Sequence, residues 1–142
     1  YKELRIVGYI GSKAVAEQRF PATNEAANLL LDVDDRELVA DGTDMTRVLL
    51  RHTDEFGNLQ PHSRVAVTLK ITGPARLVGP NPCALVGGVA GLYLRAGAAP
   101  GTVRITATAN ELGLTRKASV QVRPVNRRQR AKSAAAAALM WR

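Results

Sequence analysis

The chain has 142 residues, enough for about one domain, and 46% of them are hydrophobic, which supports a buried core. No apolar run reaches the roughly 18 residues that a membrane-spanning helix needs, so we expect no membrane partner. The net charge is +8, but five of the 20 basic residues lie at positions 126–142, where there is no acidic residue. Because a nucleic-acid binder is expected to place its charge on the folded face, we expect no nucleic-acid partner.

Two strand-like runs open the chain and predict a β-hairpin over residues 1–22. The first alternates from Leu4 to Val7, the second extends from Ala14 to Phe20, and a Gly-Ser pair lies between them. Small and polar residues follow at positions 23–28 and predict a linker. Since the chain begins without Met and in the middle of a strand pattern, we interpret it as a piece of a longer protein.

Residues 29–125 have the pattern of a β-sandwich that begins with an interrupted strand. Leu29–Val33 alternates, a charged break follows, and Glu37–Ala40 resumes the strand. Asp41 and Gly42 then indicate a turn, because Gly accepts positive φ and the Asp side chain can bond the backbone two residues later.

The next strand, Arg47–Thr53, is followed by Asp-Glu-Phe-Gly-Asn at positions 54–58. This run is typical of a short hairpin loop with Gly57 in a left-handed conformation. Segment 64–72 alternates cleanly, and one of its faces consists of Val65, Val67, Leu69 and Ile71. We therefore predict that the two strands pair as a hairpin with one buried face.

The rest of the sandwich is divided by turn signals. Gly79–Cys83 is expected to be a loop, because its two prolines cannot donate to a strand ladder. Further strands are predicted at 89–96, 102–109 and 117–123, with Gly101 in the turn between the first two. About seven short strands with turns every 8–12 residues predict an all-β fold, an immunoglobulin-like antiparallel β-sandwich.

Residues 126–142 form a basic, alanine-rich tail. Ala is the best helix former, but a helix of about ten residues is marginal in water by itself. We therefore expect the tail to be flexible or a short helix unless Leu139, Met140 or Trp141 docks on another surface.

No motif predicts a catalytic or cofactor-binding site. Asp41 and Asp54, in an acid-rich region, are weak candidates for calcium, which needs several oxygen ligands, but the spacing fits no EF-hand loop. His52 and His62 have no Ser or Cys partner in a recognisable motif, and we expect both at the surface. The residues that we assign to structural turns are Asp41, Gly42, Gly57, Asn58 and Gly101.

Five segments of the chain together resemble a known family. They are Leu-Val-Ala-Asp-Gly-Thr-Asp (38–44), Asp-Glu-Phe-Gly-Asn (54–58), Gly-Pro-Ala-Arg-Leu-Val-Gly (73–79), Gly-Leu-Tyr-Leu-Arg-Ala-Gly (91–97) and Pro-Gly-Thr-Val-Arg-Ile-Thr-Ala (100–107). In this order they are similar to the C-terminal immunoglobulin-like domain of bacterial glycoside hydrolase family 2 enzymes, the β-galactosidase group. Residues 8–17 resemble the last hairpin of the domain that comes before it in those hydrolases.

The resemblance implies a non-catalytic accessory module without a cofactor. The paired glutamates of such enzymes lie on a (β/α)₈ barrel of about 250 residues, which cannot fit here. The implied partners are other domains of the same parent chain, and the implied location is periplasmic or secreted. Because the hairpin at 1–22 would lack its partner strands, we also expect it to form homo-oligomers.

Two alternatives stay open at the level of the sequence. Invasin- and intimin-type adhesins carry a similar pattern of Ala-Asp-Gly followed by Asp-x-x-Gly-Asn, so the chain could be an adhesin repeat. The basic tail at 126–142 could instead make it a binding module for nucleic acid or anionic surfaces, whose binding would be sensitive to salt and would vanish on removal of the tail.

Overall fold

The computed structural model describes residues 2–23, 27–126, 135 and 138–139. The elements in this part are β1 (Glu3–Ile10), β2 (Lys13–Pro21), β3 (Asn28–Val33), β4 (Glu37–Val39), β5 (Met45–Thr53), β6 (Ala66–Thr72), β7 (Ala75–Val78), β8 (Cys83–Ala84), β9 (Val89–Ala96), β10 (Gly101–Ala109), a 3₁₀ turn (Asn110–Leu112) and β11 (Leu114–Arg123). None of the helices in the described part has the length and apolar character needed to cross a membrane.

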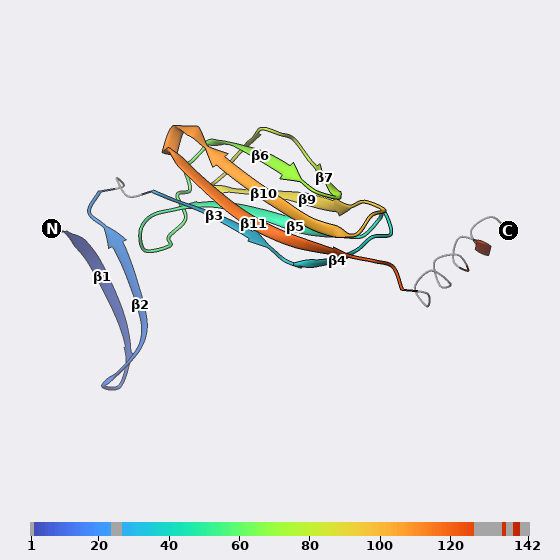
Figure 1. Ribbon diagram of the computed structural model, residues 1–142. Helices are drawn as coiled ribbons and strands as arrows, with labels where there is room; N and C mark the ends of the chain where they lie inside the picture. The colour runs from blue at the N-terminus through green and yellow to red at the C-terminus, as the bar shows by residue number, and fades with distance from the viewer. Residues whose placement is uncertain (1, 24–26, 127–134, 136–137, 140–142) are drawn as a thin grey trace.

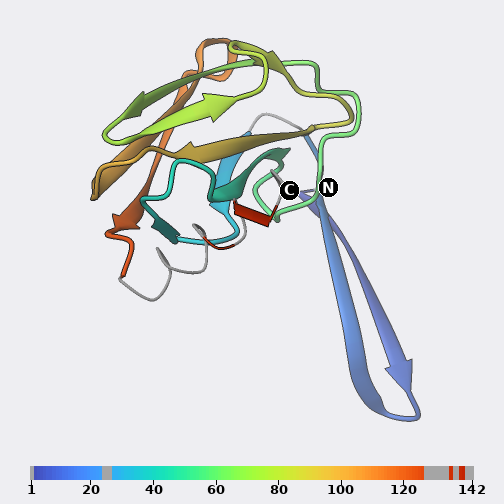
Figure 2. The same ribbon diagram turned by 90° about the vertical axis from the view of Figure 1, so that its right-hand side faces the viewer.

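Two sheets packed face to face form the body of the molecule (Figures 1 and 2). One has the strand order β4-β11-β10-β6-β8 and the other the order β3-β5-β9-β7. Strands β1 and β2 form a separate antiparallel hairpin that projects away from the sandwich. The hairpin and the sandwich are therefore distinct structural units joined through residues 22–27.

The core lies between the two sheets and is aliphatic. The larger side chains that are almost fully buried there are Leu29, Leu38, Leu50, Leu85, Leu94 and Ile105. Each fully buried side chain of this kind stabilises the fold by about 1.5–3 kcal/mol. The described residues thus form an all-β, immunoglobulin-like sandwich, as predicted. Its nine strands exceed the expected seven because the interrupted first strand counts as two, β3 and β4, and because β8 is an additional short strand.

The predicted central hairpin is wrong. Strand β5 pairs with β3 and β9, whereas β6 pairs with β10 and β8 in the opposite sheet. The connection over residues 54–65 therefore crosses from one sheet to the other. The period-2 pattern identified the buried face of each strand, but two strands of facing sheets show the same pattern as two strands of one hairpin.

Two further details differ from the expectations. The interrupted first strand changes sheets, and β4 pairs in parallel with β11, so the sandwich is not wholly antiparallel. Cys83 lies in β8 rather than in a loop, is 3% exposed, and directs its sulfur to the Val67 carbonyl at 3.6 Å. It can pair because only Pro80 and Pro82, which precede it, lack the amide hydrogen that a ladder requires.

The predicted tail over 126–142 lies largely outside the described residues. Within the described part, Ala135, Ala138 and Leu139 have helical backbone, and Leu139 is 72% exposed.

Candidate functional site

A polar feature of the sandwich that also reaches the hairpin is the turn after β5, residues Asp54 to Asn58. The Asp54 side chain is buried, with 4% exposure. Its Oδ1 atom accepts hydrogen bonds from the backbone N–H groups of Phe56 and Asn58, both at 2.9 Å. Its Oδ2 atom accepts from the Asn58 side-chain amide at 2.8 Å. One carboxylate therefore accepts from two backbone donors of the turn and from the Asn58 side chain, as expected of an Asx-type turn, while the Gly57 N–H donates to the Asp54 backbone carbonyl.

Two properties of this turn follow from its geometry. Gly57 has φ +86°, a left-handed conformation that residues with a Cβ resist. Burial acts to raise the pKa of Asp54, but the hydrogen bonds from Asn58, Phe56 and Gly57 outweigh it and lower the pKa below its ordinary value. The carboxylate is thus held in its charged form.

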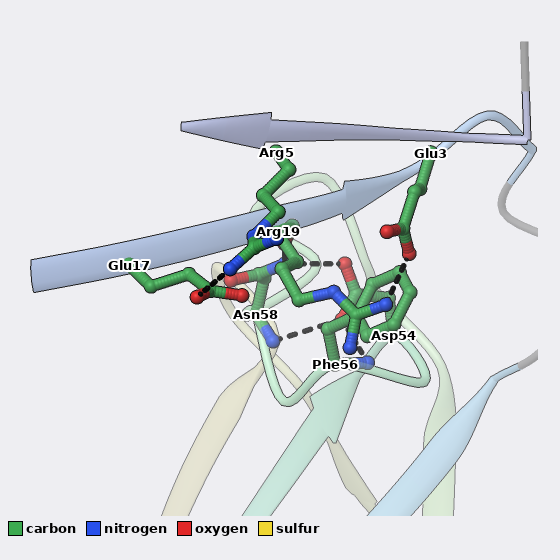
Figure 3. Close-up of polar contacts among 7 residues, drawn as sticks. All are labelled: Glu3, Arg5, Glu17, Arg19, Asp54, Phe56 and Asn58. Carbon is green, nitrogen blue, oxygen red and sulfur yellow. Dashed lines mark hydrogen bonds and ion pairs between the residues drawn. The ribbon is translucent and has the colours of Figure 1, made fainter. Parts of the chain in front are cut away.

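Asn58 connects this turn to the hairpin (Figure 3). Besides its bond to Asp54, the Asn58 amide nitrogen donates to the backbone carbonyl of Arg19 in β2 at 2.6 Å. The Asn58 amide oxygen accepts a hydrogen bond from the Gln18 side chain. Both amide hydrogens and the amide oxygen are therefore engaged, two of the three contacts being with the hairpin.

Arg19 adds a second contact between the hairpin and the turn. Its guanidinium carbon lies 4.6 Å from the centre of the Phe56 ring, a distance typical of a cation–π interaction. Glu3 of β1, the diagonal cross-strand neighbour of Arg19, forms an ion pair with it and helps to hold the guanidinium in place (Figure 3). The turn thus meets β2 through a bridging amide and through an aromatic face.

The hairpin keeps an exposed apolar face. Leu4 and Phe20 are cross-strand neighbours, Ile6 lies two residues from Leu4 on the same face, and their exposures are 52%, 38% and 54%. The opposite face carries charged side chains, including the ion pair of Arg5 with Glu17 at 2.7 Å. The two faces therefore differ sharply in polarity.

The two calcium candidates are not brought together. Asp41 precedes β5 and Asp54 follows it, so a nine-residue strand separates them. The Asp41 Oδ1 atom accepts hydrogen bonds from the backbone N–H groups of Thr43 and Asp44, both at 2.8 Å. Among the described residues, no three His, Cys, Asp or Glu side chains are grouped as a metal site requires.

The expectation that His52 lies at the surface is wrong, whereas His62 is exposed. The His52 side chain is 9% exposed, and its Nδ1 atom lies 2.7 Å from the Ser63 hydroxyl. Burial lowers the pKa of His52 because the charged imidazolium would lose its hydration. His52 is therefore a packed residue at the base of the crossover between the sheets.

Sequence reasoning named Asn58 only as a turn residue and missed its role as a bridge. It also missed Gln18, Arg19 and Phe56, because these contacts join segments about 40 residues apart. Two features of the sequence could have indicated this contact. The second hairpin strand is rich in polar residues, and the turn at 54–58 carries an aromatic residue, Phe56.

The fold and this turn define a class: an immunoglobulin-like sandwich that carries an additional hairpin on one inter-sheet turn. The family described as glycoside hydrolase family 2 C-terminal domain 5 matches residues 29–117. The chain belongs to this family. The match covers the sandwich up to the first part of β11 and does not include the hairpin.

Curated relatives support the same family. A β-galactosidase of Rhizobium radiobacter is 33% identical over 82% of this chain and 84% of that relative. A β-galactosidase of Thermoanaerobacter pseudethanolicus is 29% identical over 88% of this chain. The chain spans only 18% of the length of the latter and 12% of a β-galactosidase of Rhizobium meliloti.

Solved structures show that the fold recurs in hydrolases and adhesins. A glycosyl hydrolase family 2 member from Bacteroides cellulosilyticus matches 87% of this chain and 17% of its own, with a TM-score of 0.66 at 20% identity. The D00–D0 domain of intimin matches 87% of this chain and 65% of its own, with a TM-score of 0.60 at 18% identity. Both likenesses concern the fold alone.

Proposed function

We propose that the chain is a non-catalytic accessory domain of a larger glycoside hydrolase of the β-galactosidase group, and that its task is to hold a preceding domain through the hairpin. The observation that carries this proposal is the bridging amide of Asn58, which joins the buried carboxylate of Asp54 to strand β2. A turn whose polar groups bind a neighbouring structural unit acts as a joint. The resemblance of residues 8–17 to the last hairpin of a preceding domain supports the same role.

The acidic residues of the described part support a structural role for the module. Nine of the eleven acidic side chains in the described part accept hydrogen bonds from backbone N–H groups, arginines or Asn58; they are Glu3, Glu17, Asp32, Asp34, Asp35, Glu37, Asp41, Asp44 and Asp54. Glycoside hydrolysis needs two carboxyl groups that face one another across a bound sugar, at about 5–9.5 Å. These carboxylates are engaged in holding turns and strands instead.

Turnover of a chromogenic β-galactoside by the purified chain tests the proposal. We expect no hydrolysis above the buffer rate at any concentration of the chain. A mock purification from cells without the gene measures contamination by host enzymes. Hydrolysis that co-purifies with the chain and exceeds the mock would refute the accessory role.

A further inference from the structure

The outer faces of β6, β10 and β11 are basic, and the acid next to them in the same sheet is Glu37 of β4, which forms an ion pair with Arg123 at the end of β11. The 26 residues of these three strands include no Asp or Glu. The exposed cations on these outer faces are Lys70, Arg104, Lys117 and Arg123, and several of the positions between them carry hydroxyl groups. Because Arg123 is paired with Glu37, the three without an ion pair are Lys70, Arg104 and Lys117. Arg36, just before β4, lines the same shallow hollow. We name these three residues and Arg36 the basic face.

The strand register brings the cations of the basic face close together. Thr106 of β10 lies opposite Lys70 of β6 on one side and opposite Lys117 of β11 on the other. The two lysines are therefore two strand spacings apart, about 10 Å. Arg104 stands two residues from Thr106 on the same face, diagonal to both lysines at about 7–8 Å. All three charges lie within about one Debye length of each other at 0.1 M salt.

These cations differ from the five described arginines that are paired with a carboxylate, and, like Arg64 and Arg76, they take part in none of the described ion pairs. Arg5, Arg19, Arg47, Arg51 and Arg123 each form an ion pair with a carboxylate. None of the described ion pairs or side-chain hydrogen bonds involves a side chain of the basic face. Like charges at this spacing repel one another, and on the basic face no carboxylate pairs with them. A partner with repeated negative charges would relieve this repulsion and would therefore be complementary to the face.

From this arrangement we propose that the basic face binds an anionic polysaccharide whose sugars carry carboxylate groups. Arg104 offers a planar fork that matches a carboxylate, and the lysines flank it as point charges. Thr72, Thr106 and Ser119 lie between the cations and can both donate to and accept from sugar hydroxyls. The proposal concerns the sandwich alone and does not depend on the hairpin.

The residues of the face favour this ligand over nucleic acid. Binding of single strands relies on aromatic side chains on which bases stack, and the hollow is lined by none. Double-stranded DNA is read by a helix or ribbon that enters a groove, whereas this surface is a broad sheet face. A linear polyuronate instead presents hydroxyls and regularly spaced charges that a flat face can contact over several sugars.

The test compares two triple variants of the full chain that remove the same charge. The first is Lys70→Gln, Arg104→Gln and Lys117→Gln on the basic face. The control is Lys13→Gln, Arg64→Gln and Arg76→Gln, which are exposed cations that do not line the hollow of the basic face. Polygalacturonate is the probe, neutral dextran is the blank, and duplex DNA is the competing polyanion. Binding is measured by calorimetry at low salt, and melting curves verify that each variant is folded.

We expect the basic-face variant to lose affinity for polygalacturonate by about tenfold to a hundredfold, from three exposed charges at up to about 1 kcal/mol each, while the control loses much less. Equal losses in the two variants would overturn the proposal, because the tail or the net charge would then account for binding. Tighter binding of DNA that depends on the same three residues would overturn the choice of ligand. If the triple variant unfolds, Arg104→Gln against Arg76→Gln gives the same comparison with one charge.

Discussion

At the residue scale, the Asp54 carboxylate has a structural role, because it accepts the hydrogen bonds that stabilise its turn. Asp54 is buried just after β5, and its side chain accepts hydrogen bonds from the backbone N–H groups of Phe56 and Asn58. The same residue supports the Asn58 amide that contacts the hairpin. Its neighbour Gly57 completes the turn with a positive φ. The joint with the hairpin therefore depends on a few residues of a single turn.

Gly57→Val tests the conformation of this turn. A Cβ at position 57 would meet no atom within 4 Å, so any destabilisation comes from the left-handed φ of +86°. We expect the free energy of unfolding to fall by more than about 1 kcal/mol, because a β-branched residue resists this conformation. Gly91→Val is the matched control, since Gly91 is exposed in β9 with open space around it. Equal urea midpoints for the wild type and Gly57→Val would contradict the turn assignment.

Asp54→Asn tests the charge at the turn. The substituted amide places a donor opposite the Asn58 amide nitrogen, so we expect a loss of about 2 kcal/mol at pH 7. Because the folded-state pKa of Asp54 is lowered, the unfolded chain takes up its proton first as the pH falls. The advantage of the wild type is therefore complete above the unfolded value of about 3.9 and is lost as the pH falls through the folded pKa.

Urea unfolding of both proteins at several pH values between 7 and 2.5 measures this difference. Glu55→Gln is the control, because it removes an exposed carboxylate from the same turn. A difference between wild type and Asp54→Asn that stays constant down to pH 2.5 would show that the carboxylate is not held charged in the folded state.

At the element scale, the alternation of polar and apolar residues predicted the buried face of each strand well. Val103, Ile105 and Ala107 of β10 are fully buried, as their period of two requires. The partners of each strand could not be predicted in the same way. Strands β5 and β6 are close in sequence and each has one buried face, yet they belong to opposite sheets. Pairing depends on backbone hydrogen bonds, which any residue except Pro can form.

The hairpin shows the same limit at its contact with the sandwich. Its existence was predictable from two alternating runs around a Gly-Ser pair, and β1 and β2 have nearly the expected bounds. Its contact with Phe56 and Asn58 was not predictable, because the local sequence does not indicate which distant turn a strand will contact. Long-range contacts of polar side chains have no periodic signature.

Self-association through the apolar face of the hairpin remains a prediction. Leu4, Ile6 and Phe20 form an exposed apolar cluster on an otherwise lone two-stranded sheet, which favours pairing with a second copy. We expect light scattering to show dimers or larger species of the chain at high concentration, and Ile6→Lys to shift the chain to monomer. Val86→Lys is the control, because Val86 is an exposed apolar residue of the sandwich. A wild-type chain that stays monomeric would refute this prediction.

At the scale of the whole molecule, the proposed function depends on how the turn connects the sandwich with the hairpin. The sandwich belongs to a family of glycoside hydrolase C-terminal domains. The turn at the crossover between its sheets contacts the hairpin by hydrogen bonds and by an aromatic face. If the accessory role is correct, the hairpin must be held in a fixed orientation relative to the sandwich, because a loose hairpin could not position a preceding domain.

The most direct measurement is backbone ¹⁵N relaxation of the wild-type chain and of Asn58→Ala, each at a concentration where the chain is monomeric. We predict that the amides of β1 and β2 tumble with the same rotational correlation time as those of the sandwich in the wild type. In Asn58→Ala, which removes the bridging amide, the hairpin amides should show a shorter correlation time while those of the sandwich are unchanged. A hairpin that already tumbles independently in the wild type would contradict the proposed joint.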